Sequence, residues 1–132
     1  MSDRDDIADV LVRYATGIDS KNSALLRSCF TDDLYADYGN TGVWEGGDAI
    51  TEWMDDTHRT MPATNHMISN IVVEVDGDHA TATSYVHAVL VINEERTQAV
   101  DAVGTYHDAL VRTPAGWRIR ERRFVSTRQV FL

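Results

Sequence analysis

Three side chains, far apart in the sequence, have types and positions that suit acid–base chemistry. Asp19 stands at the end of an apolar, helix-like run, where the helix dipole favours a basic residue by about 0.3–1 kcal/mol. His66 begins a run rich in Ile and Val, and imidazole is the side chain that titrates nearest neutral pH. Tyr14 lies in the middle of the apolar stripe of the same helix. A local rule that is broken, as at Asp19, often marks a functional site.

Each of these residues also has a purely structural interpretation. Asp19 could be solvated at the helix end or paired with Lys21. His66 could donate to a backbone carbonyl where its strand begins. Tyr14 could be a core residue whose hydroxyl finds a partner. The spacing of the residues leaves both interpretations open.

The remaining candidates are weaker. We expect His58 on the solvated side of a helix, His79 in a turn, and His87 on a strand in a structural role. Cys29 lies in an amphipathic segment and is predicted to be a core residue. The histidines and carboxylates lack the spacing of a metal site, and no glycine-rich loop links a strand to a helix. The sequence therefore predicts neither a metal nor an organic cofactor.

The elements that must position these residues follow a simple order. Apolar periodicity predicts a helix over residues 3–20, a short helix over 23–30 and a third from Gly46 to about Met61, which Pro62 ends. Short strands are expected at 34–38 and 43–45, and long strands at 66–75, 80–92, 98–112 and 117–131. Helices followed by an antiparallel meander indicate an α+β fold in a single domain, residues 1–132.

Composition excludes several classes of protein. The chain has 132 residues, with 12 Lys and Arg against 21 Asp and Glu, and this acidic balance disfavours nucleic acid as a partner. One cysteine allows no internal disulfide. The sequence shows neither a signal peptide nor an apolar run of about 18–20 residues that could cross a membrane. We therefore expect a soluble cytoplasmic protein without a membrane partner.

The strand at 80–92 is apolar on both of its faces. Its even positions are mostly small and apolar, and its odd positions include Tyr85, Val89 and Val91. A sheet with two apolar faces needs a cover on each side, and the helices can cover only one. This pattern predicts a homodimer formed through the other face.

Five motifs, in this order, resemble the SnoaL-like family of the nuclear-transport-factor-2-like superfamily. They are Tyr-Ala-x-x-x-Asp at 14–19, Phe-Thr-Asp-Asp at 30–33, Asn-His at 65–66, Val-Asp-Gly-Asp-x-Ala at 75–80, and Gly-Thr-Tyr-x-Asp…Gly-Trp-Arg-Ile at 104–119. The resemblance implies a cone-shaped fold. In that fold three N-terminal helices pack on a highly curved, mainly antiparallel sheet that encloses an apolar pocket, usually in a dimer.

The resemblance also implies a site. Scytalone dehydratase, lindane dehydrochlorinase and bile-acid 7α-dehydratase use an Asp at the end of the first helix and a His at the start of a strand as a dyad. Asp19 and His66 fall on those two positions. Tyr14 matches a tyrosine of the bile-acid enzyme, and Tyr38 matches a pocket tyrosine of scytalone dehydratase.

The sequence departs from these enzymes at other positions. A second catalytic histidine of scytalone dehydratase would fall near Leu90, and a strand aspartate of the bile-acid enzyme near Ala88. The base of ketosteroid isomerase would fall near Tyr38. The particular substrates of scytalone dehydratase and of the bile-acid enzyme are therefore not implied for this chain, and ordinary ketosteroid isomerase chemistry is disfavoured.

The expected pocket suits a ring-sized, mostly hydrophobic substrate. Its expected lining is Tyr14, Tyr38, Trp53, Met54, Val86, Leu90, Tyr106 and Phe124. Asp108 should face the same cavity, where a buried carboxylate needs a partner, either Arg122 or Arg123.

Together these features predict a cofactor-independent lyase or isomerase that works by dehydration, isomerisation or polyketide-cyclase-like cyclisation. His66 would be the general base, oriented by Asp19, and Tyr14 or Tyr38 would polarise a carbonyl. The alternative is a non-catalytic module. It would be a small-molecule-binding protein or an accessory subunit resembling the β chain of ring-hydroxylating dioxygenases.

Overall fold

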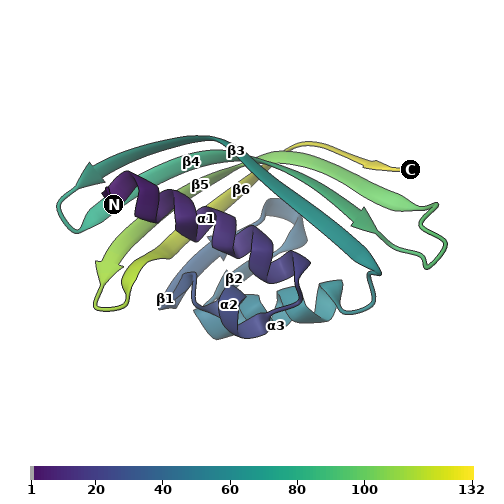
Figure 1. Ribbon diagram of the computed structural model, residues 1–132, viewed down its shortest axis with the longest axis horizontal. Helices are drawn as coiled ribbons and strands as arrows, with labels where there is room; N and C mark the ends of the chain where they lie inside the picture. Colours follow the sequence, from purple (N-terminus) through teal and green to yellow (C-terminus); the bar gives the residue numbers. More distant parts are fainter. Residues whose placement is uncertain (1) are drawn as a thin grey trace.

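The computed structural model describes residues 2–132, in which three α-helices lie against one face of a six-stranded sheet (Figure 1). The helices are α1 (Asp3–Asp19), α2 (Ser23–Arg27) and α3 (Gly47–His58), with a 3-10 turn at Gly39–Thr41. The strands are β1 (Phe30–Asp37), β2 (Val43–Glu45), β3 (Ala63–Asp76), β4 (His79–Val91), β5 (Ala99–Thr113) and β6 (Gly116–Phe131). The predicted α+β class and the predicted order of elements are confirmed.

The sheet has the strand order β2-β1-β6-β5-β4-β3. Strands β3 to β6 form the expected antiparallel meander, whereas β1 pairs with β6 in parallel. The register shifts within β3, where Asn70 has a φ of 51°, and twice between β5 and β6. Such irregularities bend strands, and the long strands accordingly arch over α1 (Figure 1).

Helix α1 has the expected signals at its start and carries the apolar stripe on one face. Ser2 caps it by accepting a hydrogen bond from the backbone N–H of Asp5, and acidic residues fill its first turn. The buried positions of the stripe are Ile7, Val10, Leu11, Tyr14, Ala15 and Ile18. Gly17 allows α2 to pack closely, because a Cβ there would lie 2.8 Å from the backbone nitrogen of Leu26. The helix continues past Gly17 and ends at Asp19.

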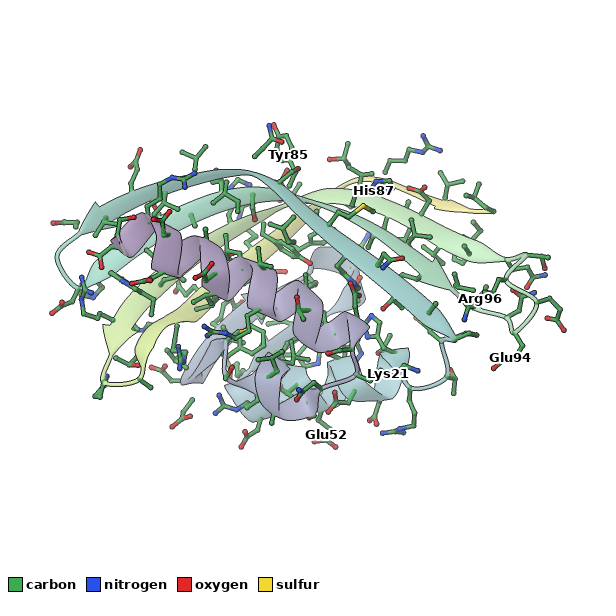
Figure 2. All side chains as sticks on the ribbon, viewed as in Figure 1. Lys21, Glu52, Tyr85, His87, Glu94 and Arg96 are labelled. Atoms are coloured by element: carbon green, nitrogen blue, oxygen red, sulfur yellow. The ribbon has the colours of Figure 1, made fainter. Side chains whose placement is uncertain are left out.

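The two faces of the long strands differ sharply. Alternate residues of β4 face the helices and are buried, from Ala80 to Ala88. The residues between them face outward, and Figure 2 shows Tyr85 and His87 pointing away from the helices. Tyr85 is 52% exposed. Within residues 2–132, no helix is long and apolar enough to cross a membrane.

Candidate active site

Asp19 and His66 are in direct contact, although 46 residues separate them in the chain. The Nδ1 of His66 lies 2.7 Å from Oδ1 of Asp19, and the backbone N–H of His66 donates to Oδ2 at 2.8 Å. The hydroxyl of Thr64 donates to Oδ1 at 2.9 Å. Lys21 does not pair with Asp19, because its Nζ donates to the carbonyls of Arg59 and Met61. The carboxylate at the end of α1 therefore anchors the start of β3.

The environment of the pair keeps Asp19 ionised and determines which nitrogen of His66 carries a proton. The side chains of His66 and Asp19 are 7% and 21% exposed. Burial raises the pKa of Asp19, but the hydrogen bonds from His66 and Thr64 outweigh it and bring the pKa below its ordinary value. An ionised carboxylate only accepts hydrogen bonds, so Nδ1 of His66 carries the proton. In the neutral ring, Nε2 then holds the lone pair that a general base needs.

Three tyrosine hydroxyls meet behind this pair. The hydroxyl of Tyr14 lies 3.1 Å from that of Tyr38 and 3.2 Å from that of Tyr106, and all three residues are buried. Burial raises the pKa of Tyr14 and of Tyr106 well above the ordinary value, so both stay protonated. Three hydroxyls carry three protons, and their two mutual contacts use two. One hydroxyl proton therefore remains for another acceptor.

A buried ion pair supports the tyrosines. Arg122 donates to both carboxylate oxygens of Asp108, at 2.8 and 2.9 Å. Its guanidinium carbon lies 4.2 Å from the ring centre of Tyr14 and 3.8 Å from that of Tyr106. Burial is the largest single influence and lowers the pKa of Arg122, but the charge and hydrogen bonds of Asp108, together with Tyr38 and Tyr14, raise this pKa above its ordinary value, so the group stays charged. Its Nη1 is buried without a hydrogen-bond partner among residues 2–132.

The structure also decides between Arg122 and Arg123 as the partner of Asp108. Across the β5–β6 ladder, Asp108 pairs with Arg122, and both point to the helix side of the sheet. The neighbouring Arg123 is exposed, because successive side chains of a strand point to opposite faces.

Most of the expected pocket lining forms one aromatic cluster. The ring of Tyr38 lies 5.7 Å from Phe124 and 6.5 Å from Trp53, and Tyr106 lies 5.4 Å from Phe124. Trp53, Leu90 and Phe124 are half-buried, whereas Met54 and Val86 are buried. The sequence reasoning missed Trp44, whose ring packs 4.4 Å from that of Trp53. Its only signal was a tryptophan in a strand of three residues.

Five cavities among residues 2–132 are lined by side chains other than the rings of this cluster. Two open hollows of about 530 and 410 Å³ lie on the outer face of the sheet, and the second is bordered by Asp108. A smaller cavity of about 180 Å³ lies between the helices and is bordered by Met54 and His58. Within the same residues, no group of three or more His, Cys, Asp or Glu side chains is arranged to hold a metal ion.

The prediction that His58 is solvated is wrong. His58 is buried, and its Nδ1 lies 2.7 Å from the carbonyl oxygen of Met54. The residue follows Met54 by four positions and Ile50 by eight, so it shares the apolar face of α3 with them. Its ring centre lies 5.8 Å from that of His66.

Comparison with known proteins places this chain in a family. The model of the SnoaL-like domain matches residues 1–123. An uncharacterised protein of Mycobacterium tuberculosis, Rv2910c, is 36% identical over 123 residues, which are 92% of this chain and 84% of that protein.

Solved structures share the fold. A protein of Novosphingobium aromaticivorans proposed to be a scytalone dehydratase matches with a TM-score of 0.85 at 23% identity, over 94% of this chain and 83% of that one. The type 2 hexachlorocyclohexane dehydrochlorinase LinA matches with a TM-score of 0.86 at 19% identity, over 98% and 88%. Because the family model covers nearly the whole sequence, the chain belongs to the SnoaL-like domain family.

Proposed function

We propose that this protein is a cofactor-independent lyase or isomerase that acts on a hydrophobic, ring-sized molecule. The observation that carries the proposal is the triple contact at Asp19, which accepts from the ring and the backbone of His66 and from Thr64. This arrangement fixes both the orientation and the tautomer of an imidazole, and it leaves the lone pair of the other nitrogen free to accept a proton.

The proposed reaction begins at Nε2 of His66. The imidazole takes a proton from a carbon next to a carbonyl, and the ionised Asp19 stabilises the imidazolium. In an elimination, the electron pair of the broken C–H bond forms a double bond and a group on the neighbouring carbon leaves with its own pair. In an isomerisation, the proton returns to a different carbon. Either route is general acid–base catalysis, which contributes about 10²–10⁴-fold to a rate.

The tyrosine hydroxyls would donate a hydrogen bond to a carbonyl oxygen of the substrate. The remaining hydroxyl proton of Tyr14, Tyr38 and Tyr106 is the donor for a carbonyl that gains negative charge. The charged Arg122 behind the rings lowers the cost of that charge.

The aromatic cluster supports the class of substrate. It runs from the buried tyrosines to the half-buried side chains of Trp53, Phe124 and Trp44, so the hydroxyls lie at the inner end of an aromatic cluster whose outer end reaches solvent. Apolar surface with a few polar groups at its end is typical of sites for ring-shaped small molecules. A polyketide, a steroid or a terpenoid with a carbonyl and an acidic C–H bond would fit this chemistry.

The test compares wild-type protein with His66→Gln on a panel of such ring compounds, followed by absorbance and mass spectrometry. We expect turnover of at least one compound by the wild type and a loss of about 10²–10⁴-fold in the variant. His79→Gln, which changes an exposed histidine at the start of β4, is the matched control. Equal turnover in His66→Gln would exclude the dyad. Absence of turnover, together with obligatory co-purification with a larger enzyme chain, would favour the accessory-subunit alternative.

We further propose that a second copy of the chain covers the outer face of the sheet. On that face Tyr85 and Val125 flank Thr105 in neighbouring strands, and Met67 pairs with His87. The side chains of Met67, Tyr85 and Val125 are all strongly exposed. Several exposed apolar side chains on one face of a sheet favour an interaction site there.

Light scattering on the wild-type protein is expected to give twice the chain mass of 14.8 kDa. Tyr85→Glu should give the monomer, because it places a charge within the proposed interface. Val12→Glu is the control, since Val12 is exposed on α1, away from this face. A monomeric wild type would refute the dimer and leave the dyad mechanism untouched.

A further inference from the structure

The groups that the proposed reaction needs are covered by other side chains. The side chain of His66 is only 7% exposed, and Tyr14, Tyr38 and Tyr106 are all buried. None of the five cavities described among residues 2–132 is lined by His66 or by these tyrosines. A ring-sized molecule can therefore contact them only after a side chain of the aromatic cluster has moved.

Trp44 belongs to the outer end of that cluster. It pairs with the buried Ala36 across the β1–β2 ladder, so its side chain lies on the helix side of the sheet. Its ring centre lies 5.8 Å from that of Tyr38 and 4.4 Å from that of Trp53. Tyr38 is buried, whereas both tryptophans are half-buried. The two indole rings therefore lie at the solvent end of the contacts with Tyr38.

The half-buried aromatic rings stand on elements that are anchored to different degrees. Phe124 is on β6, which lies between β1 and β5, and Trp53 is on α3, a helix of 12 residues. Trp44 is on β2, which has three residues at the edge of the sheet beside β1 (Figure 1). Gly42 and Gly46 flank β2 with φ values of 146° and 102°, a conformation that favours glycine. A short edge strand between two glycines moves with the least loss of packing.

The surroundings of the Trp44 ring describe what could replace it. A Cβ on Gly42 would lie 2.9 Å from the six-membered ring of this indole, so the backbone passes close to it there. Trp53 packs against the same indole with a tilt of 38°, and Tyr38 meets it edge to face. The space that the indole fills thus has the size of two fused rings and is bordered by other rings. Aromatic contacts of this kind stabilise beyond the area that they bury.

We propose that Trp44 occupies the place of the substrate's ring in the free protein and moves away with β2 when the substrate binds. The substrate class narrows to molecules with a flat aromatic system of about two fused rings, which takes over the contacts with Trp53 and Tyr38. A saturated ring system of the same size fills the space without these contacts. The inference rests on the function proposed above, and it makes Trp44 a specificity-determining residue.

The experiment follows the indole N–H signals of ¹⁵N-labelled wild-type protein during a titration with 2-naphthol, and then with its saturated counterpart, decahydro-2-naphthol. We expect 2-naphthol to shift the signals of Trp44 and Trp53. The signal of Trp117, whose Nε1 donates to Asp3 at the start of α1, should stay in place. The saturated compound should bind at least about threefold more weakly.

Three results of this titration would overturn the proposal. They are binding that leaves the Trp44 signal unmoved, equal affinity for the two compounds, and absence of 2-naphthol binding up to its solubility limit.

Variants distinguish a displaced ring from a fixed wall by the sign of the effect. Trp44→Ala should bind 2-naphthol at least about threefold more tightly than the wild type, because no side chain has to be displaced. Trp53→Ala should bind it at least about threefold more weakly, because the partner ring is lost. Val43→Ala changes an exposed neighbour on the other face of β2 and should keep the wild-type affinity. Weaker binding by Trp44→Ala would refute the displacement. If a variant does not fold, the wild-type titration decides by itself.

This inference and the proposed function fail separately, because the titration measures binding of a compound without any turnover. Shifted Trp44 and Trp53 signals in a protein that turns over none of the ring compounds would support the exchange of rings and refute the proposed reaction. Turnover that depends on His66, together with an unmoved Trp44 signal, would refute the exchange of rings alone.

Discussion

Each face of the sheet carries a histidine paired with an aspartate at hydrogen-bond distance, and the two pairs differ in their burial and in the further partners of the aspartate. On the helix side, His66 lies 2.7 Å from Asp19, and their side chains are 7% and 21% exposed. On the outer side, His87 lies 3.0 Å from Asp101, and their side chains are 46% and 27% exposed. Asp19 is also held by Thr64 and by a backbone N–H.

The comparison shows why a contact between an imidazole and a carboxylate is not enough to define a site. An exposed pair competes with water and salt and contributes about 0–1 kcal/mol. A pair shielded from water interacts more strongly, but it needs further donors to offset the loss of hydration. Thr64 and the backbone N–H of His66 supply these further donors to Asp19. Arg122 supplies them to the buried carboxylate of Asp108.

The largest effect should come from the buried pair of Asp108 and Arg122. Asp108→Asn removes the counter-charge of a guanidinium that is almost fully buried, and we expect a loss of about 3–5 kcal/mol in the free energy of unfolding. The outer counterpart, Asp101→Asn, should cost less than about 1 kcal/mol. Urea denaturation of both variants measures the difference, and similar losses would contradict this account of the two faces.

The next effect should appear in turnover. Asp19→Asn turns an acceptor into an amide that cannot stabilise an imidazolium, and we expect turnover to fall about a hundredfold. Asp101→Asn, the matched change in the outer pair, should leave turnover unchanged. Steady-state rates of both variants on the same ring compound provide the test, and a comparable loss in Asp101→Asn would remove the distinction between the pairs.

A smaller effect is expected at the tyrosines. Tyr14→Phe leaves the buried hydroxyls of Tyr38 and Tyr106 without their shared partner, at a cost of about 1–2 kcal/mol in unfolding free energy. Tyr35→Phe, on β1, changes an exposed hydroxyl that water can solvate, and its stability should match the wild type. Thermal unfolding compares the two, and an unaffected Tyr14→Phe would show that the hydroxyl contacts add no stability.

The smallest effect should be the acid dependence of stability. The folded-state pKa of Asp19 lies below its ordinary value of 3.8. The stabilisation from ionised Asp19 is therefore complete above this ordinary value and is lost as the pH falls through the lower folded pKa. Urea midpoints measured from pH 5 downward should fall more steeply for the wild type than for Asp19→Asn. Parallel slopes would mean that the charge of Asp19 does not stabilise the fold.

Particular residues show how far sequence reasoning reached. The broken rule at Asp19 and the position of His66 at a strand start pointed to two residues that the fold brings together. The apolar periodicity gave the buried face of α1, and strand alternation gave the outward position of Tyr85. These features depend on neighbours in the chain, where the geometry of a helix or strand determines which side chains share a face.

Other features depended on contacts that no local pattern encodes. The parallel pairing of β1 with β6 joins segments far apart in the sequence, and alternation alone did not identify Arg122 as the partner of Asp108. His58 was misplaced because its charge-bearing type suggested solvent, although its spacing from Met54 puts it on the apolar face of α3.

By itself, the sequence determined the order of helices and strands, the membership in an α+β class and the candidates for acid–base chemistry, because periodicity and turn residues act over short stretches of chain. Only the tertiary structure decided that Asp19 meets His66, that Arg122 lies against two tyrosine rings and that His58 lies beside the dyad. The reason is physical. Burial, desolvation and hydrogen bonding between distant segments arise only when the sheet curves over the helices, and these determine which side chains remain ionised and which can exchange a proton.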